Sequence, residues 1–199
     1  FYLDSDVWGT LWPVNTDLGW YAPVDGQRVL TVVNPLWDNY KGYDHAVKLL
    51  RLQNVLTKQV ETPTPETEKD FGNDPVKIYK GDIHVRKGYM NIFFLQNLPA
   101  RKKHRISLLR PQKDDALYPG DGYAHLELRY NNYNDLTGRR AYGAVSYNLK
   151  SLIITEETKG IKLKLNSEVN GMVEVTFDFK HLSGAKNTSD LDLSDMQLE

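Results

Sequence analysis

Five histidines are the side chains best suited to bind a metal ion or transfer protons in this chain of 199 residues. They lie far apart in the sequence, at His45, His84, His104, His125 and His181. No two of them have the i, i+4 spacing of a helical zinc site, and the chain has no cysteine that could complete one. We therefore expect no metal site and no other cofactor.

Nucleophiles and acid pairs are isolated in the same way. Ser146 lies inside an expected strand and lacks the glycine-flanked turn that exposes a catalytic serine. Neighbouring carboxylates occur only in turn-like segments, as at Asp114 and Asp115, and no pattern brings two acids together across a cleft, as glycoside hydrolysis requires. The sequence predicts no catalytic residues and favours a protein that is not an enzyme; an envelope hydrolase is the alternative.

Aromatic residues suggest a binding site instead. All four tryptophans precede residue 61, and aromatic side chains gather in loop-like stretches there, at Trp20, Tyr21, Trp37, Tyr40 and Tyr43. Such rings give a protein partner or a sugar a large contact area at a low cost in conformational entropy. The same rings could instead cover the open end of a small β-barrel, and the sequence leaves both interpretations open.

A basic patch is the second candidate site. It comprises Arg101, Lys102, Lys103 and Arg105, with His104 between them. Such a run is typical of a solvated turn, and the alternative is a surface that attracts anionic lipopolysaccharide or an acidic partner. Nucleic acid is not expected, because the stacking aromatic residues lie elsewhere in the chain. The net charge of -1 and the pI near 6.6 also lack the basic excess of a nucleic-acid-binding protein.

The composition describes a soluble, folded chain. Hydrophobic residues make up 40% and charged residues 26%, and the mean hydropathy is -0.54. The chain starts at Phe1 with no leader-like segment, so we expect a signal peptide to be absent or already removed. Without cysteine, disulfides and thiol catalysis are excluded for these residues.

The elements that must carry these residues are strands. Residues 61–74 contain two prolines and five carboxylates, which predicts an extended interdomain linker without helix or central strand. Before it, Arg28 to Val33 is rich in β-branched residues, and Asp44 to Lys58 favours strand over helix. After it, alternating runs separated by turn dipeptides such as Lys87-Gly88 and Asn170-Gly171 predict an antiparallel β-sandwich. The sequence therefore predicts an all-β protein with domains at 1–60 and 75–184 and a frayed tail at 185–199.

An ordered series of short motifs resembles the NigD-like protein family. Before residue 61 the series comprises Leu11 to Pro13 (LWP), Asp25 to Leu30 (DGQRVL) and Asn54 to Lys58 (NVLTK). After residue 71 it continues with Gly72 to Ile78, Tyr89 to Ile92, Lys103 to Leu108, Leu126 to Asn131 and Gly143 to Leu149. The resemblance covers about residues 1–180 in the order of the family. It implies an N-terminal OB-like barrel, with its first strand truncated here, and a C-terminal β-sandwich.

The resemblance also implies a cellular context. Members are exported lipoproteins of Bacteroidetes-type bacteria, and a lipidated cysteine is expected upstream of Phe1. We therefore expect a lipoprotein of the outer membrane or cell surface that meets the membrane only through this anchor. The family's association with a bacteriocin locus predicts a non-catalytic protein that binds a protein or peptide ligand. The alternative is a glycan-binding accessory lipoprotein.

Overall fold

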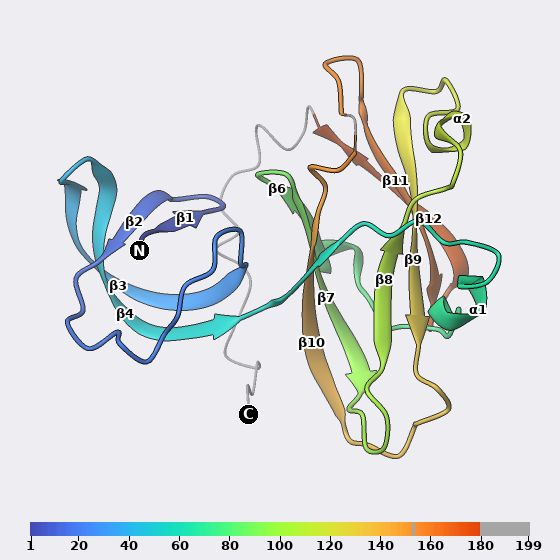
Figure 1. Ribbon diagram of the computed structural model, residues 1–199, viewed down its shortest axis with the longest axis horizontal. Coiled ribbons are helices and arrows are strands. Elements are labelled where there is room, and N and C mark those ends of the chain that lie inside the picture. Colours follow the sequence, from blue (N-terminus) through green and yellow to red (C-terminus); the bar gives the residue numbers. More distant parts are fainter. Residues whose placement is uncertain (153, 180–199) are drawn as a thin grey trace. The chain divides into compact units, whose positions relative to one another are not determined.

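The computed structural model describes residues 1–152 and 154–179, so His181 and the expected tail at 185–199 lie outside the described residues. The chain divides into two compact units, Phe1–Thr57 and a second that begins at Lys58. β-strands dominate both units (Figure 1). Among the described helices, none has the length and apolar character needed to cross a membrane.

The first unit is one open four-stranded sheet with the order β1-β2-β4-β3. The strands are β1 (Leu3–Ser5), β2 (Gly9–Pro13), β3 (Val29–Tyr40) and β4 (Tyr43–Asn54), and β2 runs parallel to β4. β3 and β4 form a long hairpin whose turn is Lys41 and Gly42, both with positive φ. A turn at residues 6–8 joins β1 to β2.

The core of the first unit is small. Leu11, Val47 and Leu49 are buried, and partly buried leucines and Val33 pack around them. Val47 and Leu49 alternate with outward-facing residues on β4, so this strand has one core face and one outer face. Such a small core leaves many large side chains of this unit exposed, Trp20 and Trp37 among them.

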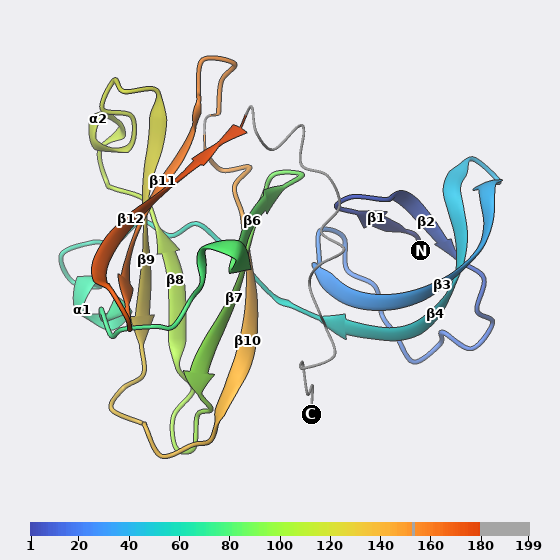
Figure 2. The same cartoon turned by 180° about the vertical axis from the view of Figure 1, so that it is seen from behind.

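The second unit is a sandwich of two four-stranded sheets (Figures 1 and 2). One sheet has the order β5-β10-β7-β6, with β5 (Leu56–Gln59), β6 (Ile83–Arg86), β7 (Tyr89–Asn97) and β10 (Arg140–Asn148). The other has the order β12-β11-β9-β8, with β8 (Arg105–Leu109), β9 (Tyr123–Asn131), β11 (Gly160–Ser167) and β12 (Gly171–Asp178). The sheets are mostly antiparallel, but β9 and β11 pair in parallel because β10 between them joins the other sheet.

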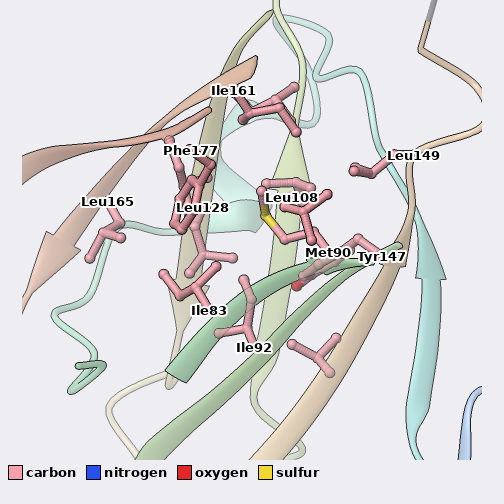
Figure 3. Close-up of a cluster of buried hydrophobic side chains, with 14 of the residues drawn as sticks. Ile83, Met90, Ile92, Leu108, Leu128, Tyr147, Leu149, Ile161, Leu165 and Phe177 are labelled. Carbon is pink, nitrogen blue, oxygen red and sulfur yellow. The ribbon is translucent and has the colours of Figure 1, made fainter. Parts of the chain in front are cut away.

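Apolar side chains from both sheets fill the space between them. Figure 3 shows Met90 and Ile92 from one sheet and Leu108 and Leu128 from the other in the same buried cluster. Met90, Leu108 and Tyr147 are completely buried. The alternation of buried and half-buried residues along β9 matches the period-2 pattern of the sequence.

Residues 61–74, which the sequence predicts to be an interdomain linker, lie within the second unit. The backbone N–H of Glu61 donates to the carbonyl of Leu108 at 2.9 Å, and the N–H of Arg110 donates back to the carbonyl of Glu61 at 2.9 Å. A short helix, α1 (Glu68–Phe71), follows and buries Phe71. The segment is thus part of the sandwich and contains a helical turn that its composition did not predict. The remaining helical turns are η1 (Lys80–Asp82) and α2 (Asp114–Leu117).

Candidate binding surfaces

Aromatic side chains line the outer face of the first sheet. Ala46 is the register partner of Trp12 on β2 and of Trp37 on β3, so the three residues form a row across three strands. Directly opposed residues share a face, and Ala46 alternates with the core residue Val47. The row therefore lies opposite the core, where the two tryptophans flank the fully buried Ala46.

Tyrosine rings lie next to the two tryptophans of this row. Tyr40 and Tyr43 are register partners at the end of the β3–β4 hairpin. The ring centroid of Tyr40 lies 5.9 Å from that of Trp37, and the ring of Tyr43 lies 4.8 Å from that of Trp12. The ring of Tyr2 lies 5.5 Å from that of Tyr43. We call these residues, Tyr2, Trp12, Trp37, Tyr40 and Tyr43, the aromatic surface.

The aromatic surface is accessible and fixed in place. Trp37 is 59% exposed and Tyr2 is 54% exposed. Next to Trp37, the carboxylate of Asp38 lies 2.7 Å from Nδ1 of His45, whose ring is stacked on Trp8 with centroids 4.2 Å apart. These side chains link β3 to β4 in addition to the backbone hydrogen bonds between the two strands. The link stabilises the strand that carries Trp37.

The structure brings together three of the five aromatic residues named from the sequence. Trp37, Tyr40 and Tyr43 belong to the aromatic surface, whereas Tyr21 packs on Phe1 with ring centroids 5.5 Å apart. Trp20 lies against Tyr21 and is 64% exposed. The hydroxyl of Tyr21 donates to Oδ1 of Asn54 at 2.9 Å, which gives this ring a structural role. That any of these residues binds a ligand stays a prediction.

Sequence reasoning missed Trp12 and Tyr2. Trp12 sits between Leu11 and Pro13, both buried, so alternation alone places its ring on the outer face. Its neighbours on that face come from β4 and β3, which follow it by about thirty residues in the chain. The alternation was available in the sequence, but the register that joins Trp12 to Trp37 was not.

The basic patch lies on the loop between β7 and β8, and the structure divides it. The side chain of Arg101 is 73% exposed, and Lys102 and Lys103 are exposed as well. Arg105 instead donates to the carboxylate of Glu61 at 2.8 Å and lies 4.1 Å over the ring of Phe71. Three of the four cations named from the sequence therefore form the exposed patch.

A buried carboxylate organises this loop. Oδ2 of Asp135, in the loop between β9 and β10, accepts the backbone N–H groups of Ala100 at 2.9 Å, Arg101 at 2.6 Å and Lys102 at 3.1 Å. The N–H of Arg101, followed by those of Lys102 and Ala100, holds the pKa of the Asp135 carboxyl well below its usual range. Asp135 is 2% exposed, so it acts as an internal anchor for the patch.

A third set of charged residues lies on the outer face of the second sandwich sheet. Oδ2 of Asp121 lies 2.6 Å from Nζ of Lys162 and 3.0 Å from Nε2 of His125. The hydrogen bond from Lys162 is the main reason why the pKa of the Asp121 carboxyl lies well below its usual range. A cavity of about 260 Å³ adjoins His125. Its lining has charges of both signs, from Glu68, Arg110, Glu127, Lys164 and Glu174. Lys164 and Glu127 lie 3.9 Å apart, so the lining favours neither an anion nor a cation.

His125 and His104 do not meet. His104 lies 2.6 Å from the hydroxyl of Tyr130 and 3.1 Å from the carbonyl of Asp135, whereas His125 contacts Asp121. Within residues 1–152 and 154–179, no three histidine or carboxylate side chains are grouped as a metal site would require.

Three solved structures share this fold. A protein of unknown function from Bacteroides vulgatus is 28% identical with a TM-score of 0.82, over 98% of this chain and 92% of the other. A NigD-like immunity protein from Bacteroides caccae is 17% identical with a TM-score of 0.64, over 85% and 82% of the two chains. A Bacteroides fragilis protein, provisionally described as a lipoprotein, is 12% identical with a TM-score of 0.55, over 89% and 90%. No curated protein matches the chain.

Two family models together account for nearly all of the described residues. The NigD-like N-terminal OB domain matches residues 1–55, and the NigD-like C-terminal β-sandwich domain matches residues 59–179. The predicted all-β fold class is confirmed, with the difference that the sheet of the OB-like domain is open and does not close into a barrel. With both models matched in order, this chain belongs to the NigD-like protein family.

Proposed function

We propose that this protein is a non-catalytic binding protein of the cell envelope whose aromatic surface docks a protein or peptide ligand. The observation that carries the proposal is the exposure of Trp37, at 59%, in one row with Trp12 and next to Tyr40. Soluble proteins seldom expose several large rings side by side unless the patch is functional. Tryptophan and tyrosine are also enriched among the few residues that supply most of the binding energy where proteins meet.

The strands give this surface the rigidity that binding needs. Trp12 and Trp37 project from paired strands on either side of β4, and Tyr40 and Tyr43 face each other across the hairpin. A surface that is ordered before the ligand arrives loses little conformational entropy on binding, which favours high affinity.

The family context supports a toxin-like ligand. One structural relative is described as an immunity protein, although at 17% identity that likeness concerns the fold. Immunity proteins of bacterial DNase toxins bind their toxins directly and with very high affinity. A bacteriocin-like protein or peptide is therefore the ligand class that we propose.

The proposal of a non-catalytic role rests on the pairing of the titratable groups. Asp121, Asp135 and Glu61 each accept hydrogen bonds from several neighbours, and the pKa of each lies below its ordinary value. Such carboxylates stay ionised at neutral pH and are poor general acids. Ser146 is buried in β10 and donates to Asn91 at 2.7 Å, which suits a structural serine.

Glycan binding is the alternative, and one observation favours it. The rings of Trp37 and Tyr40 are nearly parallel, at 24°, and Trp37 is exposed. Sugars stack on exposed aromatic faces, as they do on the strand faces of other OB folds. The same residues would then bind a chemically different ligand.

We propose export as a lipoprotein for the full-length protein. The support is the family resemblance and a structural relative that is provisionally described as a lipoprotein. Metabolic labelling with palmitate, followed by fractionation of cells that produce the full-length protein, tests this. Label in the membrane fraction is expected, and unlabelled protein in the soluble fraction would contradict it.

A photocrosslinking experiment tests the binding site. Benzoylphenylalanine is introduced at Trp37, or at Trp20 as an exposed aromatic control, in cells that produce the protein, and the crosslinked species are identified. We expect a protein or peptide adduct from position 37 and none from position 20. The affinity for the purified ligand is then compared between Trp37→Ala and Trp20→Ala.

The outcomes separate the two ligands. A loss of about 2 kcal/mol or more in Trp37→Ala, with Trp20→Ala unchanged, is the result expected for a central interface residue. Quenching of tryptophan fluorescence by a polysaccharide, lost in Trp37→Ala and without a protein adduct, would favour glycan binding. If neither ligand class depends on Trp37, the aromatic surface is not the binding site.

A further inference from the structure

Two loops meet at one end of the sandwich. Residues 98–104 join β7 to β8, residues 132–139 join β9 to β10, and both lie at the same end in Figures 1 and 2. The N–H of Leu98 donates to the carbonyl of Arg139 at 2.8 Å, and Nδ2 of Asn97 donates to the carbonyl of Leu136 at 3.3 Å. We call residues 98–104 and 132–139 together the basic tip.

The basic tip carries a local excess of positive charge. It contains four cationic side chains, those of Arg101, Lys102, Lys103 and Arg139, and one carboxylate, that of Asp135. With histidine neutral, four positive charges and one negative charge give +3, whereas the whole chain has a net charge of -1. The carboxylate is 2% exposed, accepts backbone N–H groups and lies 3.8 Å from Nε of Arg101, so cationic side chains dominate the outer surface of the tip.

The tip is held in one shape before any partner arrives. The three N–H groups bound to Asp135 fix residues 100–102, and Nζ of Lys102 lies 3.5 Å from the ring centroid of Tyr133 in the other loop. A Cβ atom on Gly138 would lie 1.8 Å from the carbonyl oxygen of Leu98, so the two loops touch through their backbones. The cations are therefore presented by a fixed platform.

The basic tip also carries an exposed apolar side chain. Leu136 is 60% exposed, and it directly follows Asp135, which binds the loop of Arg101 and Lys102. An exposed leucine on a loop tip that also carries lysine and arginine matches a lipid surface, because anionic headgroups attract the cations while the leucine enters the acyl boundary. We infer that the basic tip contacts a membrane surface that carries anionic phosphate headgroups.

Other anionic partners fit less well. A nucleic acid would need exposed rings on which bases stack, and the ring of Tyr133 in this tip is covered by the ammonium group of Lys102. An acidic protein would satisfy the cations but gives no reason for the same tip to expose Leu136. The inference goes beyond the proposed ligand binding, because it concerns the second unit and does not depend on the aromatic surface.

Flotation with lipid vesicles tests the inference. The full chain is mixed at low salt with vesicles of phosphatidylcholine alone or with about one third phosphatidylglycerol, and the bound fraction is measured. We expect binding to the anionic vesicles only, and a decrease as salt is added. Each lysine near an anionic surface contributes about a factor of five, so Lys102→Ala/Lys103→Ala should weaken binding about 25-fold.

Matched variants make the result specific. Lys69→Ala/Lys113→Ala removes two exposed lysines elsewhere in the same unit and should leave vesicle binding unchanged. Leu136→Ser should weaken binding by a factor that persists at higher salt, because it removes an apolar contact. Trp37→Ala should have no effect, which separates this inference from the proposed ligand binding.

Three results would overturn the inference. The first is the absence of binding to anionic vesicles at low salt. The second is equal loss in the tip variant and in the Lys69→Ala/Lys113→Ala control, since net charge alone would then explain the binding. The third is capture of polyglutamate by the tip lysines without any vesicle binding, which would identify an acidic polypeptide as the partner.

Discussion

Nη2 of Arg105 donates to the carboxylate of Glu61 at 2.8 Å, although the two residues are 44 positions apart in the chain. The same carboxylate accepts the hydroxyl of Ser107 at 2.7 Å and lies 2.9 Å from Nζ of Lys58. Burial raises the pKa of Glu61, but hydrogen bonds from Lys58, Ser107 and Arg105 outweigh it and lower the pKa below its ordinary value. These contacts fasten the start of residues 61–74 to β8.

Glu61→Ala should therefore destabilise the second unit. The substitution leaves the fully buried Ser107 hydroxyl and the Lys58 ammonium without their carboxylate partner. A hydrogen bond to a charged group contributes about 1.5–3 kcal/mol to stability. Because Glu61 is partly exposed, its contribution is reduced, and we expect the free energy of unfolding to fall by about 2 kcal/mol. Urea unfolding followed by circular dichroism measures it. Glu66→Ala, at an exposed position five residues further on, is the control and should change stability by less than about 0.5 kcal/mol.

Local turn chemistry made most of the strands predictable. Lys87 and Gly88 form the β6–β7 hairpin with φ values of 47° and 79°, as their sequence indicates. The Asn170-Gly171 hairpin is also confirmed, with Gly171 at φ 68° just after a three-residue loop between β11 and β12. Such turns are determined by residues that are adjacent in the chain, so they can be predicted from a single sequence.

Long-range contacts explain what the sequence did not predict. Residues 61–74 have the composition of a linker, but backbone hydrogen bonds to β8 and the Glu61–Arg105 pair make them part of the sandwich. In the first unit, the register of β2 against β4 joins Trp12 to Trp37. Both outcomes rest on residues more than twenty positions apart, and neither composition nor alternation encodes such a pairing.

Gly138→Ala should separate the two loops of the basic tip. The added Cβ would lie 1.8 Å from the backbone oxygen of Leu98, and backbone cannot move away as a flexible side chain can. We expect a loss of about 1–3 kcal/mol in stability, measured by thermal unfolding. Gly81→Ala, in the same unit with no atom near the new methyl group, should be close to neutral. Equal stability of both variants would contradict the close approach of the loops.

Removal of the hydroxyl should have different effects on stability at two buried tyrosines. No polar atom of the described residues forms a hydrogen bond with the hydroxyl of Tyr147, and burial raises its pKa well above the ordinary value. Tyr147→Phe should be neutral or stabilise by about 1 kcal/mol. The hydroxyl of Tyr130, whose pKa burial raises to about 12, lies 2.6 Å from His104 and 3.1 Å from Gln96. Tyr130→Phe should therefore cost about 1 kcal/mol, and chemical denaturation compares the two variants.

Asp135 should make stability sensitive to acid. Its pKa in the folded protein is lower than the ordinary value of 3.8, so the ionised carboxylate contributes stability that is complete above about pH 4 and is lost as the pH falls below it. Asp135→Asn removes the charge that three N–H groups share, and it should lower the Tm by a few degrees at neutral pH. Thermal unfolding from pH 6 to pH 3 should give a flatter profile for this variant than for the wild type. Parallel profiles would show that other carboxylates control the acid response.

The parallel pairing of β9 with β11 has a consequence for biosynthesis. β10 lies between them in the chain but belongs to the opposite sheet, so when β10 leaves the ribosome that sheet has all its strands while the sheet of β9 still lacks β11 and β12. β9 then has an unpaired edge until β11 is made about thirty residues later. Pairing over such sequence distances is slow, and an open strand edge is prone to aggregation in the meantime. The nascent sandwich therefore passes through a stage in which a chaperone that covers the β9 edge would raise the yield of folded protein.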